Sequence, residues 1–132
     1  MKFPVLFIGK QDGVEFCGTE EMLSTSTVVT LKRGNLLENS IVDCDGLVYR
    51  PISVDRVRIL RFNIFLNHWL RIRYEFNMPP TQMSLTNLKE IVTHRILEDR
   101  DLFEETGDVS TLLNLIAKAT TFRELISLLK NG

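Results

Sequence analysis

The side chains that could carry out chemistry are few and widely separated in the sequence. The candidate nucleophiles are Cys17 and Cys44, and the candidate bases are His68 and His94. A catalytic cysteine needs a base within hydrogen-bonding distance, and nothing in the sequence brings either cysteine to a histidine. The histidines have no partners at metal-ligand spacing, and the turn at residues 9–13 lacks the Gly-Lys-Ser/Thr ending of a phosphate loop. We therefore expect a protein that is not an enzyme and that holds no catalytic residues, no metal and no cofactor.

Two aspartates close together, Asp43 and Asp45, superficially suggest a calcium loop. In such a loop a glycine occupies the sixth position and a bidentate glutamate the twelfth, whereas here Gly46 follows at once and no such glutamate occurs. An Asp-Gly pair is instead a strong signal for a tight hairpin turn. The sequence therefore predicts a β-hairpin formed by residues 40–44 and 47–52.

Size and composition indicate one ordinary globular domain, residues 1–132. The chain is 44% hydrophobic and 25% charged, and its formal net charge of -1 gives no general attraction to nucleic acid or to anionic membranes. The N-terminal apolar run is too short for a signal peptide, and charged side chains interrupt the apolar stretch at residues 59–76. We expect a cytoplasmic location by elimination. Cys17 and Cys44 then fit two free thiols, unless the fold brings their Cα atoms within about 7 Å.

The first half of the chain has the sequence features of strands, and the second half has those of helices. This order favours an α+β fold, with a mostly antiparallel sheet from the N-terminal half packed against C-terminal helices. Thr19 can cap a short helical turn, because Glu20 and Glu21 suit a helix N-terminus. Residues 63–69 are compatible with a bulged strand, a hairpin end or one helical turn. Besides the hairpin, the expected strands are residues 5–8, 14–16, 27–31, 56–59 and 70–76.

The Met78-Pro79-Pro80 sequence is the clearest break, because two prolines stop both strand pairing and helix. After it, apolar residues recur with the helical period. We expect a helix capped by Ser84 or Thr86, and a last helix in which Thr121 and Glu124 form a capping box. The expected apolar faces are Leu88, Ile91, Val92 and Ile96; Leu112, Leu115, Ile116 and Ala119; and Phe122, Leu125, Ile126 and Leu129.

The densest cluster of like charges lies in the second half of the chain. Its carboxylates surround a single cation, Arg100, and enclose the aromatic residue Phe103. One interpretation is solvated helix ends and a loop. The other is a binding site for a basic protein partner. In such a site dense carboxylates speed association, and Phe103 would be an apolar anchor surrounded by charged residues. The carboxylates, which we call the acidic set, are Glu98, Asp99, Asp101, Glu104, Glu105 and Asp108.

Arginines alternate with apolar residues in two of the expected strands. Arg56 and Arg58 would share a face of one strand, and Arg71 and Arg73 a face of the other. Such a basic face can bind nucleic acid or an acidic protein, although it can equally be an ordinary solvent-facing surface. The aromatic residues of the second strand fall on the opposite face, away from the arginines, which disfavours base stacking.

The layout of the chain resembles that of small bacterial immunity proteins, which neutralise the toxin domains of contact-dependent or Rhs-type polymorphic toxin systems. The resemblance implies a stoichiometric, cytoplasmic inhibitor that binds a cognate toxin domain directly, and it transfers no binding residue by position. An adaptor or nucleic-acid-binding module that uses the arginine face is the alternative. The residues that carry the resemblance are Phe3-Pro4-Val5-Leu6-Phe7-Ile8, Thr19-Glu20-Glu21, Ile41-Val42-Asp43-Cys44-Asp45-Gly46-Leu47-Val48-Tyr49-Arg50 and Ala119-Thr120-Thr121-Phe122-Arg123-Glu124-Leu125-Ile126.

Overall fold

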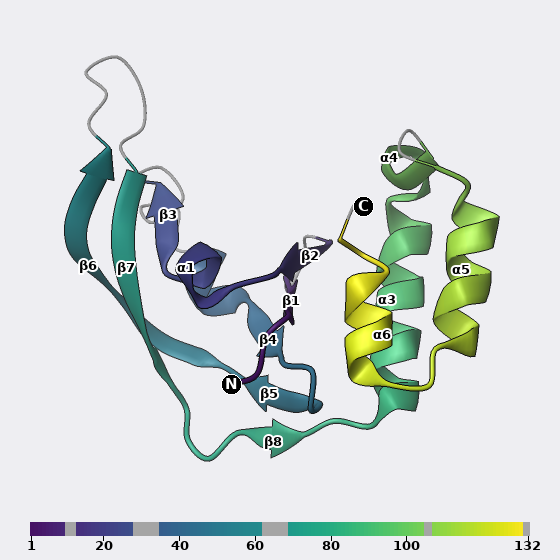
Figure 1. Cartoon of the computed structure of the whole chain (residues 1–132), viewed down its shortest axis with the longest axis horizontal. Helices are drawn as coiled ribbons and strands as arrows, with labels where there is room; N and C mark the ends of the chain where they lie inside the picture. Colours follow the sequence, from purple (N-terminus) through teal and green to yellow (C-terminus); the bar gives the residue numbers. More distant parts are fainter. Residues whose placement is uncertain (10–12, 28–34, 62–68, 105–106, 131–132) are drawn as a thin grey trace.

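The protein forms three layers, shown in Figure 1: a three-stranded sheet, a five-stranded sheet and a layer of helices. The structure is a computed structural model, and it describes residues 1–9, 13–27, 35–61, 69–104 and 107–130. Strands from the N-terminal part of the chain form both sheets, and the longer helices follow them in sequence. This arrangement confirms the predicted α+β class.

The five-stranded sheet is the middle layer, and apolar side chains cover both of its faces. Successive residues of a strand face opposite sides, so Leu6 and Val42 point to the helices, whereas Val5 and Ile41 point to the three-stranded sheet. Burial on both sides explains why the inner strands are nearly continuous apolar runs. The antiparallel order is β2-β1-β4-β5-β8. The strands are β1 (Val5–Ile8), β2 (Val14–Cys17), β4 (Ser40–Val42), β5 (Leu47–Tyr49) and β8 (Thr81–Gln82).

The predicted hairpin at Asp45 and Gly46 is confirmed as the connection between β4 and β5. Gly46 has a φ of 82°, a conformation that glycine adopts without the steric cost of a side chain. The Asp43 main-chain N–H donates to the Leu47 carbonyl at 3.0 Å and closes the turn.

Beyond β5 the chain leaves the middle sheet and enters the three-stranded sheet, whose order is β3-β7-β6. The strand predicted at residues 47–52 is therefore two strands, β5 and β6 (Pro51–Arg61). The division falls at Arg50, whose carbonyl accepts a hydrogen bond from the main chain of Asn77 at 2.9 Å. β6 pairs antiparallel with β7 (Trp69–Phe76), which confirms the strands predicted by the two-residue alternation.

The β6–β7 ribbon curves around the middle sheet (Figure 1). Its register shifts in three places, between Pro51 and Ser53, Arg56 and Arg58, and Ile59 and Arg61, and such bulges bend a strand and increase its twist. The curved ribbon covers a core between the two sheets. That core contains Val5, Cys17, Leu23, Ile41 and Tyr49, with Tyr74 and Phe76 packed against it.

The short α1 (Glu20–Leu23) confirms the helical turn predicted after Thr19, whose hydroxyl accepts the Met22 N–H at 3.2 Å. β3 (Thr25–Thr27) follows it and pairs with β7. Of the strand predicted at residues 27–31, only Thr27 lies within the described residues. The ambiguous segment at residues 63–69 also lies outside them, apart from the first residue of β7. The 3-10 helix η1 (Asn35–Glu38) precedes β4.

The helical layer consists of α3 (Leu85–Glu98), α4 (Arg100–Glu104), α5 (Val109–Lys118) and α6 (Phe122–Ser127). Ser84 is the cap of α3, and its hydroxyl accepts the Asn87 N–H at 3.1 Å. No helix among the described residues is long and apolar enough to cross a membrane. The core between the helices and the middle sheet contains Leu6, Ile8, Val42, Val48, Leu88, Val92, Ile96, Val109, Ile116, Ala119, Leu125, Ile126 and Leu129.

The prediction that Leu115 belongs to the buried face of α5 is wrong, because this side chain is 46% exposed. Val109 and Ile116, two helical turns apart, define the buried face instead. At α6 the hydroxyl of Thr121 accepts the Glu124 N–H at 3.1 Å, as the capping box predicts. The Glu124 carboxylate, however, accepts the N–H of Thr120, one residue before the cap, at 3.2 Å.

Candidate functional site

The acidic set gathers at one end of the helical layer, where α4 connects α3 to α5 (Figure 1). Glu98 ends α3, Asp99 follows as its C-cap, and Asp108 is the N-cap of α5. Asp101 and Glu104 belong to α4. All of these side chains are exposed. The fold therefore brings the described members of the acidic set together at one exposed end of the helical layer.

Two further members of the predicted site are described only in part or not at all. Phe103 lies within α4, but its side chain falls outside the described part of the structure. Glu105 lies outside the described residues. The predicted apolar anchor at the centre of the acidic set therefore stays a prediction.

Some carboxylates of the acidic set also have local structural roles. Glu98 lies 2.9 Å from the His94 imidazole, and Glu104 accepts a hydrogen bond from Arg100 at 2.9 Å. Asp108 accepts hydrogen bonds from Thr111 and from the Ser110 N–H, and these bonds lower the pKa of its carboxyl group, the Thr111 bond most. Helix capping and ion pairing thus account for the positions of these residues. They do not neutralise the acidic set, because Arg100 is the one arginine or lysine between residues 98 and 108.

The arginine face differs from the predicted one. The bulge in β6 makes Val57 the extra residue, so Arg56 stands opposite Ile72 while Arg58 stands opposite Arg71. Ile72 and Arg71 are neighbours in β7, and neighbouring residues face opposite sides of a sheet. The regular alternation on which the predicted shared face of Arg56 and Arg58 depends is therefore interrupted between these two residues.

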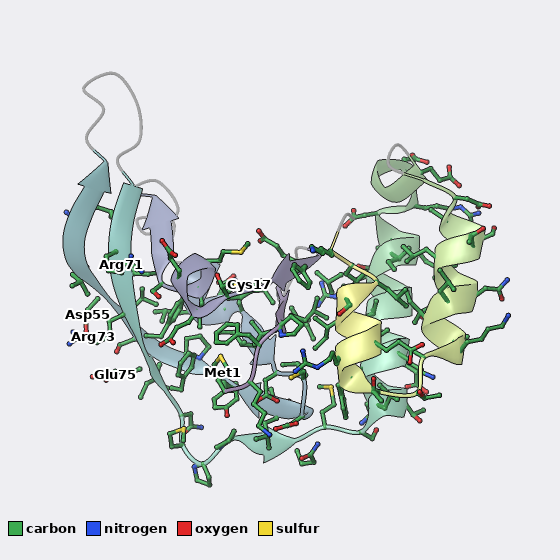
Figure 2. The ribbon with its side chains drawn as sticks, viewed as in Figure 1. Met1, Cys17, Asp55, Arg71, Arg73 and Glu75 are labelled. Carbon is green, nitrogen blue, oxygen red and sulfur yellow. The ribbon has the colours of Figure 1, made fainter. Side chains whose placement is uncertain are left out.

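Acidic residues also interrupt the arginines of β7. Arg71 and Arg73 are two residues apart and lie on the same side of the strand, as predicted. However, Arg73 stands opposite Asp55 and is followed two residues later by Glu75. Figure 2 shows Asp55, Arg73 and Glu75 close together on the outer side of the ribbon. The surface carries mixed charge rather than a basic stripe.

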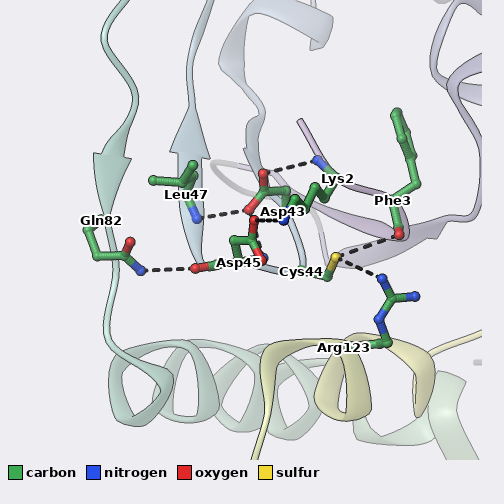
Figure 3. Close-up of polar contacts among 8 residues, drawn as sticks. All are labelled: Lys2, Phe3, Asp43, Cys44, Asp45, Leu47, Gln82 and Arg123. Carbon is green, nitrogen blue, oxygen red and sulfur yellow. Dashed lines mark hydrogen bonds and ion pairs between the residues drawn. The ribbon is translucent and has the colours of Figure 1, made fainter.

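The cysteines are free thiols in different surroundings. Cys17 is buried, its Sγ donates to the Thr19 carbonyl at 3.4 Å, and burial raises the pKa of its thiol. Cys44 is half-buried; its Sγ donates to the Phe3 carbonyl at 3.6 Å and accepts from Arg123 at 3.4 Å (Figure 3). The hydrogen bonds that these thiols make within the described residues include no histidine.

His94 is a surface residue with 72% of its side chain exposed, and His68 lies outside the described residues. Across the described part of the chain, no three His, Cys, Asp or Glu side chains are placed to hold a metal ion.

Asp43, which the sequence analysis assigned to the hairpin turn, is a buried side chain that binds main-chain groups of the N-terminal region. Its Oδ1 accepts the N–H groups of Asp45 and Leu47 at 3.0 Å, and its Oδ2 accepts the Lys2 N–H at 3.2 Å (Figure 3). The side chain is therefore occupied by three N–H donors, which fits a structural role in the hairpin and not a cation ligand.

Two half-open hollows were not predicted, because each combines segments that are distant in sequence. One of about 590 Å³ lies at the end of the middle sheet, where Arg50 and Arg95 meet Glu38 and Ser40. The other, of about 330 Å³, lies between α1 and β7. Its lining residues are Glu20, Leu23, Ser24, Val57, Arg71, Ile72, Arg73, Tyr74 and Phe76.

Comparison of the chain with models of protein families, with curated proteins and with solved structures found no match. The functional assignment therefore depends on the charge and geometry of the surfaces described above.

Proposed function

We propose that this chain is a non-catalytic binding protein, and specifically an immunity protein that neutralises a cognate bacterial toxin domain by direct contact in the cytoplasm. The observation that supports the proposal is the gathering of the acidic set on one exposed end of the helical layer. There, Glu98, Asp99, Asp101, Glu104 and Asp108 come from three helices and their caps.

Electrostatics favours a basic partner for this surface. Exposed charges act over about 8 Å at physiological ionic strength, so carboxylates on adjacent helix ends act together on an approaching protein. Their summed field accelerates association with a basic surface and repels acidic proteins. A nuclease toxin, whose surface must attract nucleic acid, has the charge that this surface would select.

The proposal is tested with the gene that precedes this one in its genome. An immunity gene is expected directly downstream of a large toxin gene. The C-terminal domain of that toxin should bind the purified chain in a one-to-one complex and should stop growth only in cells that lack the chain. A neighbourhood of unrelated metabolic genes, or a neighbouring toxin domain that the chain neither binds nor neutralises, would overturn the proposal.

Charge reversal then tests the acidic set itself. Asp101→Lys with Glu104→Lys changes two exposed residues that cap no helix, and we expect the association rate at low salt to fall about tenfold and to become less salt-sensitive. The matched control is Glu15→Lys with Glu90→Lys, which makes the same charge change at exposed positions of β2 and α3. Equal association rates for the two double variants would remove the acidic set from the interface.

The alternative function, an adaptor or nucleic-acid-binding module on the arginine face, has less support. Asp55 and Glu75 flank Arg73, and the rings of Tyr74 and Phe76 pack against the core between the sheets. A phosphate binder must lose affinity steeply as salt increases. Fluorescence anisotropy with short DNA and RNA at low and moderate salt therefore decides between the two, and a steep salt slope would favour the alternative.

A further inference from the structure

Strand β7 is paired along only part of the edge that faces α1. β3 covers residues 69–71 of β7, and the Ile72 N–H donates to the Ser24 carbonyl at 2.8 Å. N-terminal to Ser24 the chain turns into α1, whereas β7 continues to Phe76. Among the described residues, the last four residues of β7 therefore have a partner strand on one side only, namely β6.

The direction of the main-chain groups along this edge follows from the register. In an antiparallel strand, alternate residues direct their N–H and C=O groups to opposite neighbours. Since Ile72 donates toward Ser24, Tyr74 and Phe76 direct their groups to the same side. Within the described part of the chain, the main-chain N–H and C=O of Tyr74 have no hydrogen-bond partner on that side.

The hollow of about 330 Å³ lies at this incomplete edge. Leu23, Tyr74 and Phe76 supply apolar surface to it, and Arg73 supplies charge. Figure 2 shows Arg73 on the outer side of the ribbon, the side opposite to the one that Tyr74 and Phe76 turn to the core. The hollow thus offers main-chain hydrogen-bonding groups together with separate apolar and charged surfaces.

We propose that this edge receives an extended peptide segment, which adds to β7 as a strand and continues the line of β3. The main-chain groups select an extended backbone, because only a strand offers donors and acceptors at matching spacing. Four residues of β7, at about 3.3 Å each, give room for a segment of about four residues. The inference rests on the proposed function only in that the segment would belong to the protein partner.

The register also specifies the side chains of the added segment. In an antiparallel arrangement, residues opposite Tyr74 and Phe76 share the inner side, so apolar side chains fit there. The residue opposite Arg73 lies on the outer side, where an acidic side chain completes a cross-strand pair. The residue opposite Glu75 fits a basic side chain for the same reason. Read from its N-terminus, the segment is apolar, basic, apolar and acidic.

The probe for this inference is the blocked peptide acetyl-Gly-Val-Lys-Val-Glu-Gly-amide, titrated to about 5 mM into the ¹⁵N-labelled protein, a range that detects millimolar dissociation constants. We expect the amide signals of Tyr74 and Phe76 to shift and their hydrogen exchange to slow. N-methylation of the second valine, which lies opposite Tyr74, should abolish the shifts, because it removes the N–H that donates to the Tyr74 carbonyl. N-methylation of the lysine, whose N–H points away from β7, is the control and should retain them.

A charge exchange supplies the second readout. Arg73→Glu changes an exposed side chain and should weaken binding severalfold, and a peptide with lysine in place of glutamate should restore it. Absence of shifts at Tyr74 and Phe76, or equal binding of the two N-methylated peptides, would overturn the inference. Shifts that depend on protein concentration without peptide would assign the edge to a second copy and would also overturn it. Since no toxin is present, these outcomes leave the test of the acidic set unaffected.

Discussion

Replacement of Asp43 by alanine should destabilise the protein more than any other single change of an acidic residue at the hairpin. The side chain is 1% exposed and accepts three main-chain N–H groups, two within the turn and one from Lys2. A hydrogen bond to a charged acceptor is worth about 1.5–3 kcal/mol, and a buried donor left without a partner costs about 1–3 kcal/mol. Lys2 is exposed, so water can replace that bond. The two turn bonds then give an expected loss of about 3 kcal/mol.

Two comparison variants make this prediction specific. Asp43→Asn keeps an oxygen for the turn N–H groups of Asp45 and Leu47 but turns an amide N–H toward Lys2, so a loss of about 1 kcal/mol is expected. Asp45→Ala removes only a surface ion pair between Lys2 and Asp45, 3.2 Å long, for which about 0.5 kcal/mol is the expected limit. Urea denaturation gives the three free energies of unfolding. If Asp43→Ala and Asp45→Ala lost equal stability, the buried carboxylate would not organise the hairpin as described.

Three other changes should have measurable effects. Gly46→Ala places a Cβ 2.5 Å from the Phe122 ring at a φ of 82°, so urea denaturation should show a loss of about 2–4 kcal/mol in the free energy of unfolding. Gly107→Ala is the control, because a Cβ there has nothing within 4 Å, and it should be neutral or slightly stabilising. Thr121→Ala removes the N-cap of α6 and should cost about 1 kcal/mol in the same assay. Burial, aided by the negative charges of a Cys17 thiolate and of Glu15, raises the pKa of Tyr74 from 10.0 to about 12. The folded state therefore keeps the phenol proton that the unfolded state loses; the contribution of Tyr74 to stability is constant below about pH 10 and falls by up to about 2 kcal/mol as the pH rises to about 12. Tyr74→Phe should reduce the alkaline loss of stability by this amount in urea denaturation at a series of pH values, and the part that comes from the raised pKa of the Cys17 thiol should remain.

Features that depend on neighbouring residues in the sequence could be predicted. The Asp-Gly turn, the cap of α3 and the cap at Thr121 each depend on a contact within a few residues. The structure confirms the turn and Thr121, and of the two caps predicted for α3, Ser84 and Thr86, it shows Ser84. The buried face of α5 was harder, because apolar residues occupy several adjacent positions of this helix. Periodicity alone could not decide between Leu115 and Val109; the packing of α5 against α3 and the middle sheet decides it.

Features that depend on the pairing of distant strands could not be predicted. The two-residue alternation of residues 56–59 assumes an unbroken ladder, and the extra residue Val57 interrupts that ladder between Arg56 and Arg58. The incomplete edge of β7 depends on where β3 begins, which is set by the end of α1 just before it. Of the candidate surfaces, only the acidic set could be found from the sequence, because its members are close neighbours along the chain.

The acidic set and the β7 edge lie in the two outer layers of the protein, separated by the middle sheet (Figure 1). The two surfaces should contribute to binding in different ways. Exposed carboxylates act at a distance and govern the association rate, which salt weakens. Hydrogen bonds and apolar contacts along a strand form only after docking and govern the dissociation rate. A toxin domain that uses both surfaces must therefore reach around the middle sheet, and reversal of Asp101 and Glu104 would slow association while Arg73→Glu would speed dissociation. A partner whose kinetics respond to only one of these changes uses only one of the two surfaces.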